Sequence, residues 1–174
     1  MSRRATRLRR YCPVVALAAC AVAVAVVLVV VDRLTREPPN YSRIEDGLYL
    51  GGYVAEPPPG TRAVLNLCEA EDPYSAEVHR WAAIPDAEPA PSLVWLREQV
   101  AFIDTQRQAG LLVYVHCRNG VSRSGMVVVA YVMSKNGWSR YEALEFVRTK
   151  RPGVRPNPAF TPLLAEWETV VKGQ

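Results

Sequence analysis

The chain has 174 residues, a hydrophobic share of 49% and a formal net charge of +4, which together fit one domain of ordinary size with some residues left over. Five arginines within the first ten positions account for that charge, because the other 16 basic residues nearly balance the 17 acidic ones, so we expect no nucleic-acid partner. Four cysteines without a CxxC pair and two histidines predict neither a disulfide framework nor a zinc or other metal site.

Residues 12–31 form a run of twenty uncharged residues dominated by Val and Ala. At helical rise this length matches a hydrocarbon core of about 30 Å. The run therefore predicts one transmembrane helix, between a basic tail at 1–11 and a linker at 32–42. The excess of arginine before the run favours a cytoplasmic N-terminus and a domain on the far side of the membrane, although the side of the domain stays open.

Two alternatives remain for this run. Leu17-Ala18-Ala19-Cys20 resembles the lipobox of bacterial lipoproteins, which would make Cys20 a lipid attachment site, although a polar linker usually follows such a cysteine. A cleaved signal peptide would need a shorter apolar region with a small-residue site near its end, whereas the Ala21 to Ala23 stretch lies in the middle of the run.

Residues 43–174 are expected to form the folded domain. Short apolar runs bounded by turn residues predict strands. The run from Leu111 to Val115 suits a strand that is buried on both faces. The strand candidates are 48–50, 63–67, the stretch 78–84, and 111–115.

Helices show clear boundary signals. Ser92 can cap a helix whose apolar residues step by three and four and which Gly110 closes. Ser139 to Glu142 form a capping box, and the helix that follows ends before Pro152. Asn157-Pro158 opens a last helix. Strands alternating with helices predict an α/β domain with a central, mostly parallel sheet flanked by helices.

The run His116-Cys117-Arg118-Asn119-Gly120-Val121-Ser122-Arg123-Ser124-Gly125 lies where a strand ends and a helix to about Asn136 begins. Backbone N–H groups of such a loop, at a helix N-terminus, form an anion site suited to phosphate. A cysteine placed there is stabilised as the thiolate. Arg123 can hold two phosphate oxygens with its planar fork, and Gly120 permits a close approach of the backbone.

This run resembles the signature loop of the protein tyrosine phosphatase superfamily, and Gly120 to Ser124 is typical of its dual-specificity branch. The similarity runs from about Ile44 to Trp167 and includes Arg151-Pro152 and the stretch from Pro156 to Phe160. It implies the cysteine-phosphatase fold and a two-step mechanism without metal or cofactor. In that mechanism Cys117 attacks phosphorus, a phosphocysteine forms, and water hydrolyses it.

The same resemblance implies roles around the cysteine. Ser124 would assist departure of the Cys117 sulfur in the second step. His116 would orient the loop and support the thiolate, and Asn157 would brace it. The phosphate-binding positions would be Arg118, Asn119, Gly120, Val121, Ser122 and Arg123.

The leaving oxygen needs a proton, so a carboxylic acid must reach the site from another loop. The resemblance places an Asp about thirty residues before the cysteine, and Asp86 stands 31 residues before Cys117. Glu88 is the rival acid, and Glu71 or Asp72 are more remote alternatives. Asp86 is the predicted general acid.

His79 and Cys68 are two further candidates for a functional role. His79 is expected to be a surface or hydrogen-bonded imidazole rather than a ligand. Cys68 ends a predicted strand and is best explained as a small buried hydrophobe. The alternative is that Cys68 lies near Cys117 and forms a protective, reversible disulfide with it on oxidation.

Three functions remain open. The first is a phosphoprotein phosphatase that acts on phosphotyrosine and on phosphoserine or phosphothreonine. The second is a phospholipid or phosphoinositide phosphatase, which a membrane tether would suit, but the loop has Val121 and Ser122 where relatives with lipid substrates carry extra cations. The third is a phosphate-binding module without activity. Relatives that have lost activity usually lack the Cys, Arg or Asp, whereas Cys117, Arg123 and Asp86 are all present. The oligomeric state is not predictable.

Overall fold

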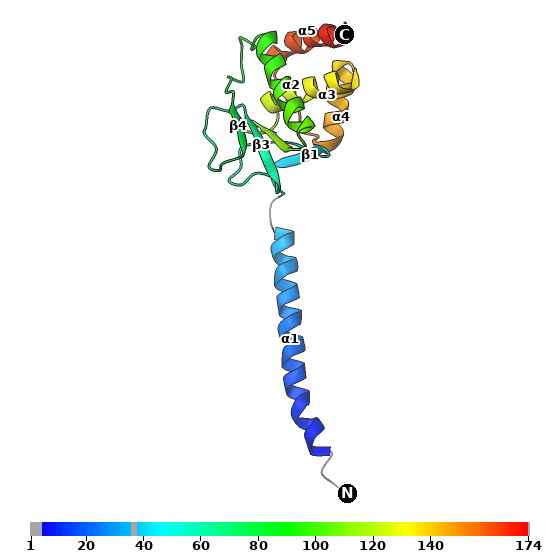
Figure 1. The fold of residues 1–174 in the computed structure, drawn as a ribbon. Helices are drawn as coiled ribbons and strands as arrows, with labels where there is room; N and C mark the ends of the chain where they lie inside the picture. The colour runs from blue at the N-terminus through cyan, green and yellow to red at the C-terminus, as the bar shows by residue number, and fades with distance from the viewer. Residues whose placement is uncertain (1–4, 36–37, 174) are drawn as a thin grey trace. The chain divides into compact units, whose positions relative to one another are not determined.

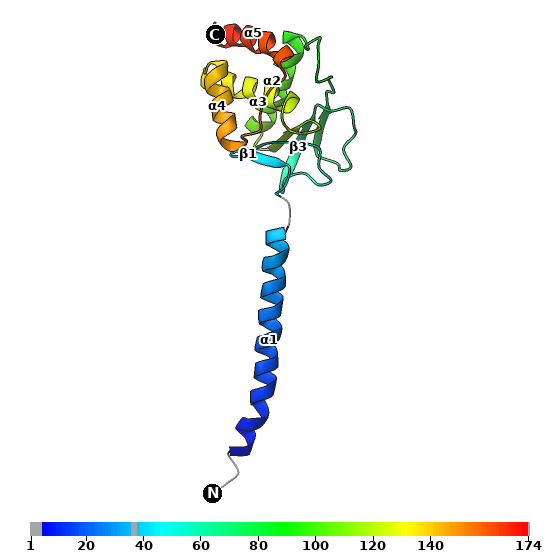
Figure 2. The same ribbon diagram turned by 180° about the vertical axis from the view of Figure 1, so that it is seen from behind.

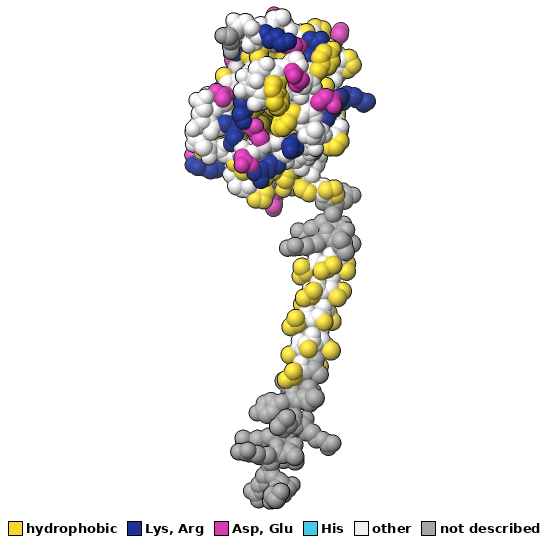
Figure 3. Space-filling view, turned by 90° about the vertical axis from the view of Figure 1, so that its right-hand side faces the viewer, with side chains coloured by type: hydrophobic (Ala, Val, Ile, Leu, Met, Phe, Trp, Pro, Cys, Tyr) yellow, Lys and Arg dark blue, Asp and Glu magenta, His cyan; other side chains and the backbone are white. Residues whose placement is uncertain are grey.

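The computed structural model describes residues 5–35 and 38–173 and divides the chain into two compact units, Met1–Pro38 and Pro39–Gln174. The first unit contains helix α1 (Ala5–Thr35), which includes the predicted segment 12–31. Its side chains at 15 and 17–31 are exposed and mostly apolar (Figure 3), whereas those at 12–14 and 16 lie outside the described set. Within the described residues, no helix meets the length and apolarity that a membrane crossing requires, so the structure does not support the predicted transmembrane helix.

The second unit is built on a five-stranded sheet with the order β1-β2-β5-β3-β4. Only β1 and β2 pair antiparallel; the other three pairings are parallel, as predicted. Figures 1 and 2 show helices α2 to α5 gathered on one side of this sheet. The strands are β1 (Tyr41–Glu45), β2 (Leu48–Gly51), β3 (Thr61–Asn66), β4 (Val78–Trp81) and β5 (Leu112–His116).

Two expectations for the strands were wrong in their boundaries. Tyr41 and Ser42, expected in the linker 32–42, begin β1 instead and pair with Gly51 and Leu50. Only Ile44 of this strand is fully buried, so β1 lacks the apolar run by which the other strands are recognised. The stretch 78–84 is strand only as far as Trp81, although the N–H groups of Ala82 and Ile84 still donate to the carbonyls of Asn66 and Leu67 before the loop that carries Asp86.

The helices begin and end where the sequence signals indicate. Ser92 caps α2 through the Trp95 N–H, and the Ser139–Glu142 capping box caps α4. Asn157 caps a single 3-10 turn, η1, before the last helix begins, so the predicted helix starts with a tighter turn. The bounds are α2 (Leu93–Gln108), α3 (Arg123–Asn136), α4 (Arg140–Lys150), η1 (Pro158–Phe160) and α5 (Thr161–Lys172).

The core lies between the sheet and α3. Residues 123–133 of α3 are all buried, which explains how a Val127-Val128-Val129 run with poor intrinsic helix propensity remains helical. Gly137 ends this helix with φ of 68°, in the left-handed region that favours glycine. Strand β5 is buried from Val113 onward, so the junction between β5 and α3 is held rigidly from both sides.

Candidate active site

The loop between β5 and α3 curls around the sulfur of Cys117, which is 2% exposed. The backbone N–H of Cys117 donates to the Gly51 carbonyl, with 3.3 Å between nitrogen and oxygen, so the loop starts against the end of β2. Gly120 has φ of 67°, and an added Cβ would overlap the backbone of Gly51 and Gly52. The loop can therefore pass this close to β2 only with glycine at position 120.

The loop directs hydrogen-bond donors at the Cys117 sulfur. Burial by itself raises the pKa of the thiol, but it is outweighed by the Ser124 hydroxyl and by the backbone N–H groups of Ser124, Gly120 and Val121, so the pKa is lowered. The Ser124 oxygen lies 3.3 Å from the sulfur and 3.3 Å from the Gly51 carbonyl. Its single proton can serve either acceptor, which allows Ser124 to follow a change of charge on sulfur.

Arg123 is 5% exposed, and among the described residues its guanidinium is held through Nη1. One terminal nitrogen, Nη1, donates to the carbonyls of Leu67 (3.4 Å) and Ile84 (2.9 Å) and to a Glu69 carboxylate oxygen at 2.8 Å. The Nε of Arg123 is buried and has no hydrogen-bond partner among the described residues. A buried donor left without a partner costs free energy, and a bound phosphate oxygen would satisfy it.

Asp86 lies beside the loop, as its spacing predicts. The Ser122 hydroxyl donates to an Asp86 carboxylate oxygen at 2.6 Å and accepts from the Asn157 backbone N–H at 2.9 Å. The Asn157 side chain in turn donates to the Asp86 carbonyl at 2.9 Å. Ser122 and Asn157 thus join the segment that carries Asp86 to the loop between β5 and α3. Glu88, the rival acid, is exposed on the same segment.

The outer side of the loop is held by an arginine from the end of α4. Arg151 donates through Nε to the Gly120 carbonyl at 2.7 Å and through Nη2 to the Asn119 carbonyl at 3.2 Å. The same Nη2 donates to the Asn40 side chain at 2.6 Å. Because both loop carbonyls face Arg151, the adjacent N–H groups remain free to face the sulfur.

Arg118 is exposed at the mouth of the site. Its carbonyl accepts from the Tyr53 N–H at 2.9 Å, and its side chain lines a cavity of about 380 Å³ together with Tyr53, Cys68 and Ala70. This cavity adjoins the loop between β5 and α3 through Arg118.

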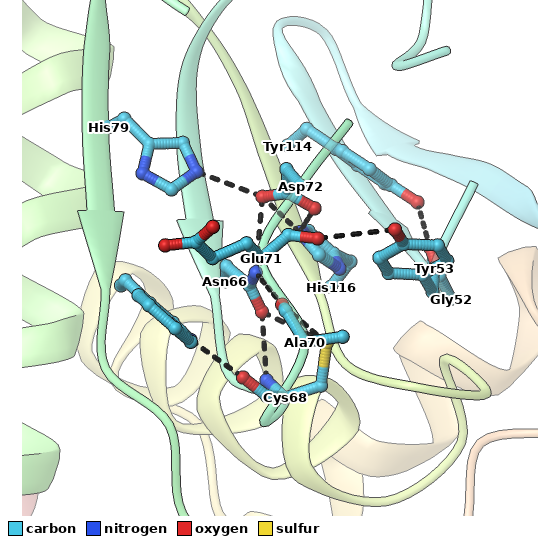
Figure 4. Close-up of polar contacts among 12 residues, drawn as sticks. Gly52, Tyr53, Asn66, Cys68, Ala70, Glu71, Asp72, His79, Tyr114 and His116 are labelled. Carbon is cyan, nitrogen blue, oxygen red and sulfur yellow. Dashed lines mark hydrogen bonds and ion pairs between the residues drawn. The ribbon is translucent and has the colours of Figure 1, made fainter. Parts of the chain in front are cut away.

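His116 is fully buried behind the loop. Its ring stacks on Tyr114 with 5.1 Å between centroids, and Nε2 lies 3.1 Å from an Asp72 oxygen (Figure 4). The Asp72 side chain is 1% exposed and also lies 2.8 Å from His79 Nε2, so His79 is a hydrogen-bonded imidazole. A carboxylate enclosed in this way is not available as the general acid. Glu71, the preceding residue of the same loop, is exposed.

Cys68 is a free, buried thiol. Its Sγ is 3.0 Å from the Asn66 side-chain oxygen, and burial raises its pKa. The burial of Cys68 agrees with its interpretation as a small buried residue of the core. The disulfide with Cys117 stays a prediction.

Glu69, Asp72 and Arg151 have roles at the site that sequence reasoning missed or understated. Glu69 and Asp72 lie in the loop after β3, and their partners Arg123 and His116 are more than forty residues away in the chain. The only signal available for Arg151 was its place in the Arg151-Pro152 pair. Contacts over such separations depend on the folded topology, which local patterns do not encode.

Residues 61–170 match the family model for the dual specificity phosphatase catalytic domain. The chain is 35% identical over 151 residues to dual specificity protein phosphatase 1B of Arabidopsis thaliana, a match that covers 82% of this chain and 90% of that protein. It is 36% identical over 110 residues to protein phosphatase Slingshot homolog 3 of Rattus norvegicus, where the match covers 62% of this chain and only 17% of the relative.

Solved structures agree. The crystal structure of human DUSP28 aligns with a TM-score of 0.69 at 26% identity, over 78% of this chain and 97% of that one. Tk-PTP in its active form aligns with a TM-score of 0.65 at 31% identity, over 76% of this chain and 99% of that one. The chain belongs to the dual-specificity phosphatase family of the protein tyrosine phosphatase superfamily.

Proposed function

We propose that the protein hydrolyses phosphomonoesters of phosphoproteins through a phosphocysteine intermediate on Cys117. The observation that carries this proposal is the set of donors around one sulfur. The hydroxyl and N–H of Ser124 and the N–H groups of Gly120 and Val121 lower the pKa of Cys117. Beside them, Arg123 keeps a buried Nε donor without a partner in the described chain.

In the first step the phosphoryl group binds the loop N–H groups and Arg123. The Cys117 thiolate attacks phosphorus, a P–S bond forms, and the P–O bond to the leaving group breaks. Asp86 gives its proton to the departing oxygen. Its bond to Ser122 places this acid at the edge of the loop, where a leaving group would emerge.

In the second step water attacks the phosphocysteine and the P–S bond breaks, which releases inorganic phosphate and the Cys117 thiolate. Asp86, now a carboxylate, takes the proton from water. The Ser124 hydroxyl donates to the departing sulfur, as its position 3.3 Å away allows. His116 and Asn157 act on the loop and on the Asp86 segment and do not touch the phosphoryl group. None of these steps calls on a metal or cofactor.

A phosphoprotein substrate is favoured over a phospholipid by the few cations within the loop itself. Within the signature run only Arg118 presents an exposed basic side chain, and the buried Ser122 is committed to Asp86 and Asn157. The neighbouring cavity is lined by Tyr53 and Ala70 as well as Arg118, which suits a peptide side chain better than a polyanionic headgroup.

The test is hydrolysis by the full chain of a phosphopeptide panel, a phosphoinositide panel and a small aryl phosphate. We expect turnover of phosphopeptides and the aryl phosphate, and a loss of about 10³-fold or more in Cys117→Ser. Asp86→Asn should lower kcat by about 10²- to 10⁴-fold, whereas Glu88→Gln should not. If the chain hydrolyses only the phosphoinositides, its substrate is a lipid and not a phosphoprotein. If it binds the phosphopeptides without hydrolysing any substrate, it is a phosphate-binding module.

The membrane location is a separate proposal that rests on the sequence. It is supported by the uncharged run at 12–31 and the arginines before it. Alkaline carbonate extraction of cells expressing the full chain should leave the protein in the membrane pellet. Complete release into the supernatant would exclude a membrane-spanning segment.

A further inference from the structure

A buried carboxylate lies behind residues 117–122, the proposed catalytic loop, where it contacts His116. Asp72 belongs to the loop between β3 and β4, and its side chain is 1% exposed. Its Oδ2 lies 3.2 Å from His116 Nε2, 2.8 Å from His79 Nε2 and 3.1 Å from the Asn66 amide nitrogen (Figure 4). Three donors from β3, β4 and β5 thus meet on one oxygen of the carboxylate, which offsets part of the cost of burying it, whereas Oδ1 has no hydrogen-bond partner among the described residues.

The carboxylate determines which nitrogen of His116 carries a proton. Because a carboxylate only accepts, the Nε2 that faces Asp72 must bear hydrogen. The Nδ1 of His116 is buried and has no hydrogen-bond partner in the described part of the chain. Without Asp72, neither nitrogen would have a strong partner to select a tautomer or to fix the plane of the ring.

The ring of His116 is linked to the backbone that holds the thiol. It stacks on Tyr114, whose hydroxyl donates to the Gly52 carbonyl. The preceding carbonyl, that of Gly51, accepts from the Cys117 N–H. Since His116 also directly precedes Cys117, a change in ring position is passed to the start of the loop from two directions.

Asp72 does not contact the reacting atoms itself, and its own charge opposes a thiolate. A negative charge near a thiol disfavours the thiolate, as the effect of Asp72 on the neighbouring Cys68 illustrates, where it helps to raise the pKa. If Asp72 acted only by its charge, removing that charge would favour the Cys117 thiolate. If it acts through His116, removal would disfavour the thiolate. The two modes of action therefore predict opposite signs.

We propose that Asp72 is a positioning residue that acts through His116: it holds the imidazole in one tautomer and one orientation and so keeps the loop in the form that stabilises the Cys117 thiolate. His79, whose side chain is 31% exposed, is the solvent-facing partner of the same carboxylate. This inference rests on the phosphatase function proposed above.

The test is Asp72→Asn in the full chain, with alkylation of Cys117 by iodoacetamide followed against pH. Peptide mass spectrometry separates Cys117 from the other cysteines. The apparent pKa of the Cys117 thiol should rise by about one unit, because the asparagine amide no longer selects Nε2–H on His116. With the small aryl phosphate, kcat should fall about 10-fold while KM changes less than about 3-fold.

Glu71→Gln is the matched control, because it removes the same charge from the adjacent, exposed residue. It should leave both the alkylation midpoint and kcat unchanged. A midpoint in Asp72→Asn that stays or falls, or an equal rise in Glu71→Gln, would overturn the proposal.

A second measurement needs no variant and covers the case in which Asp72→Asn does not fold. Histidine ¹⁵N NMR of the wild-type chain should show hydrogen on Nε2 of His116; hydrogen on Nδ1 alone would refute the role of Asp72. Both alkylation and NMR are independent of turnover. A wild-type chain that hydrolyses no phosphoester in the panel would therefore count against the proposed function, whereas an active wild type without the midpoint rise would count against Asp72.

Discussion

At the scale of single residues, Glu69 helps to orient the guanidinium of Arg123. Its carboxylate binds Arg123 Nη1 at 2.8 Å, and its pKa is lowered by its own backbone N–H first and by Arg123 second. The side chain is 57% exposed, so solvent weakens the pair. Glu69→Gln should therefore raise KM for the aryl phosphate by about 3-fold, a small effect compared with loss of the arginine itself.

The check on this prediction is steady-state kinetics of Glu69→Gln beside Arg123→Lys. The lysine variant keeps the charge but loses the planar fork, and we expect a fall of about 10²- to 10³-fold in kcat/KM. If Glu69→Gln proved as damaging as Arg123→Lys, Glu69 would have a role beyond orienting the guanidinium.

At the scale of elements, the catalytic loop depends on close contact with the end of β2. In Gly120→Ala the new Cβ would overlap the Gly51 and Gly52 backbone and lie 2.6 Å from an Arg151 nitrogen. Since β2 and β5 are held by their pairing in the sheet, we expect residues 118–121 to shift and to move their N–H groups away from the Cys117 sulfur. We expect turnover of the aryl phosphate to fall by at least about 10²-fold, since misplaced groups of this kind cost that much.

Gly137→Ala separates this steric effect from backbone strain. Gly137 has nearly the same φ, 68° against 67°, but an added Cβ there meets no atom within 4 Å. It should destabilise the fold by about 1 kcal/mol and leave kcat unchanged. Urea unfolding of both variants, with kinetics on the same preparations, distinguishes the two effects; equal losses of turnover would contradict the role of the loop contact.

The elements that the sequence predicts are those with local signals. Ser92 and the Ser139 capping box mark helix starts, and Gly137 marks an end, because capping involves residues three or four apart. Strand β1 was missed because its pairing with β2 stabilises a half-exposed segment that has no apolar run of its own. The site shows the same division: Cys117 and Arg123 share one motif, whereas the contacts of Glu69 and Asp72 depend on tertiary structure.

At the scale of the whole molecule, Asp72 joins three strands of the sheet to the catalytic loop, so its ionisation should affect global stability. Burial would raise its pKa, but hydrogen bonds from His116 and then His79 outweigh burial, and the pKa in the folded protein lies below the ordinary value of 3.8. A group with a depressed folded-state pKa stabilises the fold fully above its unfolded-state pKa. That contribution is lost as the pH falls through the folded-state pKa.

The expected outcome concerns the difference between two unfolding curves. The free energy of unfolding of Asp72→Asn should lie about 1 to 3 kcal/mol below that of the wild type at neutral pH, because the amide bonds the imidazoles less strongly. The gap should narrow as the pH falls below about 4, where Asp72 becomes protonated in the unfolded chain, and should close as the pH falls through the lower pKa of Asp72 in the folded protein. Urea titrations followed by tryptophan fluorescence between pH 3 and 7 measure both curves. A gap that stays constant over this range would mean that packing around position 72, rather than its charge, holds these strands to the loop.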